Sequence, residues 1–213
     1  MRSVTLLAAI TIAAPLRAQS AEATLDRALA AYAKVRTVRA SFVQTLTNAL
    51  LGTTATSAGE VVQQRPQYLA IRFTDPAGDR IVADGAWVWI YLPSSNPGQV
   101  IRTRIGSNGA GVPDVTAQFL AAPRAKYDLA DGGPAVVNGR PARVLRLTAR
   151  DPALPFTAAT VWVDEDDGLV RQFEATDPSG LTRRVTITRL ATNVPVDRAA
   201  FDFTPPPGVR RRC

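Results

Sequence analysis

Residues 59–73 read GEVVQQRPQYLAIRF and contain two strand-like segments, which meet at Arg65-Pro66. From Leu69 to Phe73 every second residue is a large apolar one, the period of a strand that buries one face. Proline is tolerated at the first residue of a strand, so Pro66 is compatible with starting the second segment. This stretch therefore predicts two consecutive strands, and the rest of the chain repeats the pattern.

Turn signals separate strand-like segments along most of the chain. The pairs Asp84-Gly85, Asn138-Gly139 and Asp167-Gly168 are typical of two-residue hairpin turns, and longer turns are expected at 75–78 and 177–180. Hairpins join antiparallel neighbours, and no alternation of helices with strands indicates a parallel sheet. We count ten or eleven strands.

Two segments have helical spacing instead. Residues 23–35 place Leu25 and Leu29 on one side of a helix, and a second, short helix is expected within 112–120, with Phe119 on its apolar side. A large antiparallel sheet must curl or split. The outcomes are a closed or sandwiched all-β fold, or an incomplete barrel with helices over its open side. The two amphipathic helices favour the second, an α+β fold with a curved antiparallel sheet and a helical lid.

The ends of the chain differ from its middle. Arg2 precedes an apolar stretch over 4–16, too short for the ~20 residues of a membrane span, and small residues follow it. We therefore expect residues 1–20 to be a removed signal peptide, with no lipid-attachment cysteine after it. Residues 21–209 are expected to form one domain, and 210–213 a basic tail.

The composition excludes most catalytic chemistry. The chain has no histidine, and its single cysteine is Cys213, so Ser-His-Asp triads, thiol nucleophiles and zinc sites are not expected. The acidic run at 164–167 lacks calcium-loop spacing and is interpreted as a hairpin turn. We expect no enzyme, no metal site and no cofactor. The net charge of +7 does not indicate a nucleic-acid binder, because no basic run is interleaved with aromatic residues.

Four short motifs follow one another at defined spacing. They are Phe-x-Gln at 42–44, Gly-x(5)-Arg-Pro at 59–66, Asp-Gly-x(3)-Trp-x-Tyr-x-Pro at 84–93 and Phe-x-Phe-Thr-Pro-Pro at 201–206. Their order, over about 21–209, resembles the LolA family of periplasmic carriers of outer-membrane lipoproteins. The resemblance implies a half-open barrel with a helical lid, and it implies that Arg65 is the residue that latches the lid closed.

The same resemblance implies a cavity for acyl chains on the concave face. We expect it to be lined by Leu29, Phe42, Leu69, Ile71, Trp89 and Phe119. The implied partners are acylated outer-membrane lipoproteins and an inner-membrane lipoprotein-releasing ABC transporter. An outer-membrane acceptor lipoprotein is a further partner that the sequence leaves open. The protein is expected to be a periplasmic monomer.

Three alternatives stay open at this point. The cavity of this fold suits a carrier of another lipid or a glycolipid equally well. A lipid-sensing regulatory domain has the same fold. In a purely structural envelope protein, Trp87, Trp89 and Tyr91, which share one strand face, belong to a filled core.

Overall fold

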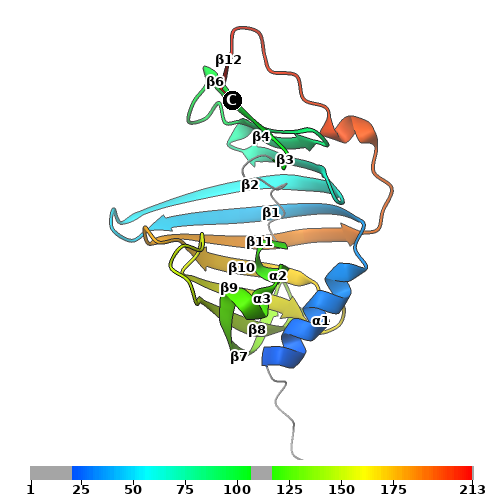
Figure 1. The fold of residues 1–213 in the computed structure, drawn as a ribbon, viewed down its shortest axis with the longest axis vertical. Helices are drawn as coiled ribbons and strands as arrows, with labels where there is room; N and C mark the ends of the chain where they lie inside the picture. Colours follow the sequence, from blue (N-terminus) through cyan, green and yellow to red (C-terminus); the bar gives the residue numbers. More distant parts are fainter. Residues whose placement is uncertain (1–20, 107–116, 213) are drawn as a thin grey trace, which may run out of the picture.

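The computed structural model of the chain describes residues 21–106 and 117–212 and contains one large curved sheet (Figure 1). The first six strands are β1 (Thr37–Asn48), β2 (Thr53–Gln64), β3 (Tyr68–Asp75), β4 (Ala77–Asp84), β5 (Trp87–Tyr91) and β6 (Gln99–Arg104). The others are β7 (Tyr127–Val137), β8 (Arg140–Ala149), β9 (Ala158–Asp164), β10 (Val170–Thr176), β11 (Leu181–Thr192) and β12 (Arg210–Arg212). The expected α+β architecture is confirmed.

The order of the strands across the sheet is β12-β6-β5-β4-β3-β2-β1-β11-β10-β9-β8-β7. Every neighbouring pair is antiparallel except β12 and β6, which are parallel. The described residues thus contain twelve strands rather than ten or eleven. Part of the difference is β12, because residues that we expected to form a tail pair with Gln99, Val100 and Ile101 instead.

The predicted tight turns form where the chain has small or turn-forming residues. Asn138 and Gly139 join β7 to β8 with φ angles of 50° and 78°, the positive values that a two-residue hairpin of this type requires. Asp167-Gly168 lies between β9 and β10, which confirms the acidic run as a hairpin turn. Residues 1–20, 107–116 and 213 lie outside the described part, so the expected signal peptide and the first residues of the expected second helix fall outside it.

The sheet buries residues on both of its faces. Leu69 and Val88 belong to an inner core, whereas their neighbours Ala70 and Trp89 belong to a separate outer core. Since consecutive residues of a strand point to opposite faces, these two clusters lie on opposite sides of the sheet. Strands β3 and β5 are therefore apolar on both faces.

Different segments cover the two faces. The helices α1 (Ala21–Ala33), α2 (Ala117–Leu120) and α3 (Pro123–Lys126) lie over the β7–β10 half of the inner face (Figure 1). The 3₁₀ helix η2 (Arg198–Phe201) contacts β3 and β4 and buries Phe201 in the outer core. Within the described residues, no helix has the length and apolar character needed to cross a membrane.

Candidate functional site: an apolar cavity on the inner face

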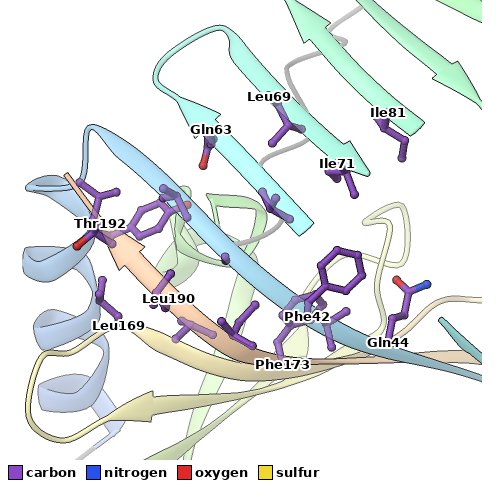
Figure 2. A pocket seen from close by; sticks show the side chains of 18 of the residues that line it. Phe42, Gln44, Gln63, Leu69, Ile71, Ile81, Leu169, Phe173, Leu190 and Thr192 are labelled. Atoms are coloured by element: carbon purple, nitrogen blue, oxygen red, sulfur yellow. The ribbon is translucent and has the colours of Figure 1, made fainter. Parts of the chain in front are cut away.

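A cavity opens on the inner face of the sheet, between β1–β4 on one side and β10–β11 on the other (Figure 2). Its empty volume is about 1040 Å³, including solvent at its open side. The C-terminal end of α1 borders it through Tyr32, and Val35 follows. Most of the lining side chains are aliphatic or aromatic, so the cavity offers burial and few directional polar contacts.

Strands β1 and β3 each contribute alternate residues. Val38, Ala40 and Phe42 of β1 line the cavity, and Gln44 continues the same series. On β3 the series is Leu69, Ile71 and Phe73. The period of two follows from the pleat of a regular strand, so the sequence pattern predicted these inner faces correctly.

On strand β11 the alternation of cavity-lining residues shifts by one position. Val185 and Ile187 line it with odd numbers, but Leu190 and Thr192 line it with even numbers. The register with β1 shifts at this point, so that Thr188 is an extra residue between two paired positions. Such a β-bulge moves the following side chains to the other face of the strand. Strict alternation in the sequence therefore misses Leu190, and β11 was absent from our predicted site.

Gly59 of β2 makes room for the aromatic wall of the cavity. A Cβ atom at this position would lie 2.6 Å from the carbonyl oxygen of Arg72 and 2.9 Å from the ring of Phe42. The Phe42 ring lies edge-on to that of Phe73, with 5.7 Å between centroids, and both residues pair with Gly59 across the sheet. The absence of a side chain at Gly59 thus allows two aromatic rings to meet above it.

Arg65 joins the β2–β3 connection to α1. Its Nη1 donates a hydrogen bond of 3.0 Å to the backbone carbonyl of Tyr32, and its guanidinium lies 3.9 Å from the centroid of the Tyr32 ring. Tyr32 itself lines the cavity. One arginine side chain therefore holds both the backbone and the ring of the residue that borders the cavity from the helix.

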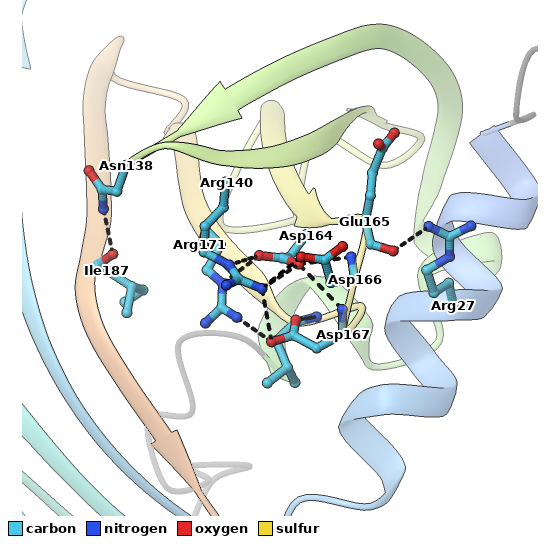
Figure 3. Close-up of polar contacts among 10 residues, drawn as sticks. Arg27, Asn138, Arg140, Asp164, Glu165, Asp166, Asp167, Arg171 and Ile187 are labelled. Atoms are coloured by element: carbon cyan, nitrogen blue, oxygen red, sulfur yellow. Dashed lines mark hydrogen bonds and ion pairs between the residues drawn. The ribbon is translucent and has the colours of Figure 1, made fainter.

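The β9–β10 turn supports α1 from the other side (Figure 3). Arg27 of α1 donates a hydrogen bond of 3.1 Å to the carbonyl of Glu165. Gly168 packs so closely against the helix that a Cβ atom there would lie 3.0 Å from the carbonyl oxygen of Arg27. On the far side of α1, Arg124 of α3 forms ion pairs with Glu22 and Asp26.

The turn is itself held by a buried carboxylate. Asp164 is fully buried and accepts hydrogen bonds from Arg140 and Arg171, and from the backbone N–H of Asp166 at 2.9 Å (Figure 3). Burial alone would raise the pKa of Asp164, but the hydrogen bonds from both arginines and from the turn backbone hold that pKa well below its ordinary value. Arg140 and Arg171 thus form ion pairs with three of the four acidic side chains of the run, Asp164, Asp166 and Asp167.

Of the six cavity residues predicted from the sequence, three line the cavity, two pack in the inner core outside it, and Trp89 lies elsewhere. Phe42, Leu69 and Ile71 line the cavity together. Phe119 is buried behind it, with its ring 5.3 Å from that of Phe173, which does line the cavity. Leu29 packs against the inner core without reaching the cavity.

Trp89 is a correction, because it lies on the opposite face of the sheet. Its ring packs 5.8 Å from that of Phe203, and its Nε1 donates a hydrogen bond of 2.7 Å to the carboxylate of Asp84. Its neighbours on the strand, Val88 and Ile90, belong to the inner core instead. Trp89 and Tyr91 of β5 point to the outer side of the sheet, where Phe203 of the C-terminal segment packs against both rings.

Polar groups are found at the border of the cavity. Among the described residues that line the cavity, Arg183 is the one with a charged side chain, and it is exposed. Gln44 donates a hydrogen bond of 3.1 Å to Ser57 on the neighbouring strand. In the described ranges, no cluster of three or more His, Cys, Asp or Glu side chains is placed to hold a metal ion.

Comparison with known proteins identifies the family of the chain. The family model "Outer membrane lipoprotein carrier protein LolA" matches residues 33–204. An outer-membrane lipoprotein carrier protein of Edwardsiella ictaluri is 28% identical over 177 residues, 83% of this chain and 80% of the relative. Its counterpart in Chromobacterium violaceum is 26% identical over 207 residues, 96% of this chain and 94% of the relative.

Solved structures are similar in fold. An uncharacterized conserved protein from Thermus thermophilus matches with a TM-score of 0.57 and 16% identity, covering 90% of this chain and 99% of that one. MucB in the MucA/MucB complex of Pseudomonas aeruginosa matches with a TM-score of 0.54 and 18% identity, covering 86% of this chain. The match spans only 61% of that longer chain.

Proposed function

Because the chain belongs to the LolA family of outer-membrane lipoprotein carriers, we propose that its cavity holds the acyl chains of lipoproteins during transfer through the periplasm. Cargo would be received from an inner-membrane lipoprotein-releasing ABC transporter and delivered to the outer membrane, directly or through an acceptor lipoprotein. The protein would act by binding and release, with no catalytic step. The apolar cavity on the inner face is the observation that carries this proposal.

The physical need for such a carrier is large. Burying one CH₂ group is worth ~0.8 kcal/mol, so an acyl chain of about sixteen carbons prefers an apolar site to water by roughly 10 kcal/mol. Val185, Ile187 and Leu190 on one wall, with Leu69 and Ile71 on the other, supply an apolar site of this kind. Release requires only that the next site binds the chain better.

An empty apolar cavity also needs a cover, because exposed apolar surface attracts membranes and other proteins. In this proposal the C-terminal end of α1, which borders the cavity at Tyr32, is part of that cover and Arg65 is its latch. The guanidinium holds the carbonyl and the ring of Tyr32 while the cavity is empty. An entering acyl chain would displace Tyr32 from the border and break both contacts.

The direct test is native mass spectrometry of the protein purified from envelope extracts. A bound triacylated lipoprotein or lipopeptide is the expected result. Bound free lipid or glycolipid would favour the carrier of another lipid, which the same cavity accommodates. A protein that carries nothing and accepts no fluorescent acyl probe would overturn the carrier proposal.

A pair of variants on one strand tests the cavity itself. Leu190→Glu places a charge in the cavity, and binding of a fluorescent acyl probe should weaken at least tenfold. Ala191→Glu is the matched control, because Ala191 is exposed and is the next residue along β11. Equal probe binding by the two variants would contradict the assignment of the cavity.

A further inference from the structure

We propose that the tip of the β1–β2 hairpin inserts into the surface of an anionic lipid bilayer and brings the open cavity to the membrane. The inference rests on the proposed function, since it describes how acyl chains would pass between bilayer and cavity without crossing water. The tip consists of residues 49–52, between β1 and β2. It projects beyond the neighbouring turns at this end of the sheet (Figure 1).

Two adjacent leucines form the tip. Leu50 is 86% exposed and Leu51 is 72% exposed, the highest values among the exposed large hydrophobic residues of the described chain. The turn is ordered by its own contacts, because the backbone N–H of Leu51 donates to the side-chain oxygen of Asn48 at 3.1 Å and Gly52 has a φ of +63°. A single exposed leucine is ordinary, but a pair at a projecting tip invites an apolar partner.

The hairpin around the tip carries no charge. Residues 40–59 contain no Asp, Glu, Lys or Arg, although a fifth of the whole chain is charged. A charged side chain near the tip would oppose entry into the acyl region of a bilayer, because its hydration would be lost. An uncharged, threonine-rich hairpin with two leucines at its end meets this requirement.

One face of β1 runs from the cavity to the tip. Gln44 lines the cavity, and Leu46 is the next residue of β1 on the same face. Leu46 pairs with Arg183, the charged residue at the border of the cavity. Leu46 lies two residues before Asn48, the last residue of β1, and is thus about 7 Å along the strand from the start of the tip.

The position of Arg183 favours an anionic membrane as the binding partner of the tip. An apolar tip buried ~5–10 Å into the interface would bring a side chain two strand residues behind it close to the phosphates. Arg183 is exposed there, and the chain as a whole has a net charge of +7. The rim of a protein interface is polar and often charged, whereas residues 49–52 carry no polar side chain and the whole stretch 40–59 carries no charge.

The experiment is co-sedimentation of the purified protein with vesicles of phosphatidylethanolamine and phosphatidylglycerol. The double variant Leu50→Asp/Leu51→Asp should bind at least tenfold more weakly than the wild-type chain. Val136→Asp is the matched control, because Val136 is another large hydrophobic residue, 70% exposed, on β7. This control should bind like the wild-type chain, and Leu50→Phe/Leu51→Phe should retain binding.

A second measurement separates this inference from the proposed function. A soluble fluorescent acyl probe should load the cavity equally well in the wild-type chain and in Leu50→Asp/Leu51→Asp, while acyl transfer from vesicles should slow only in the variant. If Leu50→Asp/Leu51→Asp loads the probe normally and still binds vesicles like the wild-type chain, the membrane role is overturned and the carrier function stands. Vesicle binding that appears only when a membrane protein is present would also overturn it, in favour of a protein partner.

Discussion

At the scale of single residues, the cavity depends on what is missing at Gly59 as much as on what lines it. The rings of Phe42 and Phe73 occupy the space above this glycine. A side chain at Gly59 would push against the backbone oxygen of Arg72, which cannot move without disturbing the β2–β3 pairing. The requirement for glycine is thus steric and does not involve a positive φ.

We expect Gly59→Ala to lower the free energy of unfolding by about 1–3 kcal/mol and to weaken binding of an acyl probe, because the added methyl group overpacks the wall of the cavity. Chemical denaturation and fluorescence titration measure the two effects. Gly98→Ala is the control, since a Cβ atom at Gly98 meets nothing within 4 Å. Similar behaviour of both variants would rule out the steric explanation.

Arg65 supports a second prediction at this scale. Arg65→Leu removes the hydrogen bond to the Tyr32 carbonyl and the contact with its ring, and should lower the free energy of unfolding by about 1–2 kcal/mol while the fold stays intact. Transfer of lipoprotein to an acceptor membrane should be impaired. Arg65→Lys keeps the charge but loses the planar fork, so it should restore transfer only in part. Normal transfer by Arg65→Leu would show that the latch assignment is wrong.

At the scale of elements, the β9–β10 turn positions α1 and is stabilised by charge. Asp164 stays ionised in the folded protein because Arg140 and Arg171 hydrogen-bond to it. In the unfolded chain its pKa returns to about 4. Its contribution to stability is therefore complete above that value and is lost progressively as the pH falls below it.

We expect the free energy of unfolding to decrease steeply from about pH 4 downward, and Asp164→Asn to flatten that decrease. At neutral pH the same variant should be destabilised by about 2–3 kcal/mol, because both arginines lose their buried partner. Urea denaturation at a series of pH values measures this. Asp166→Asn is the control, since the Asp166 side chain is 68% exposed and its ion pair with Arg140 should contribute little.

The edge strand β12 gives a prediction about the end of the chain. Its three arginines are exposed and pair only with β6, so removal of residues 210–213 should leave a soluble, folded protein. A small loss of thermal stability is expected, because the edge of β6 is uncovered. Thermal unfolding and gel filtration test this, and loss of soluble expression would contradict it.

At the scale of the whole molecule, the large sheet has an apolar inner face that the described helices cover mainly over β7–β10. A ligand that enters the cavity adds apolar contacts that the empty protein lacks. A soluble acyl chain at about 100 times its dissociation constant should therefore stabilise the protein by ~2.7 kcal/mol. Calorimetry should show a melting temperature that rises with acyl concentration in the wild-type chain but much less in Leu190→Glu.

The sequence alone determined the fold class, the hairpin turns and the inner faces of β1 and β3. These features depend on local rules: turn residues that accept positive φ, and a period of two that the pleat imposes. Phe42, Leu69 and Ile71 line one cavity for this reason, and the order of short motifs was enough to indicate the family that the comparison identified.

Only the tertiary structure decided which face of β5 lines the cavity, where β11 changes phase and what Arg65 holds. Strand β5 is apolar on both faces, so the orientation of Trp89 depends on the distant segment that brings Phe203 against it. The bulge at Thr188 has no marker residue and appears only in the pairing with β1. These features arise from contacts between residues far apart in the chain, and such contacts produce no periodic pattern in the sequence.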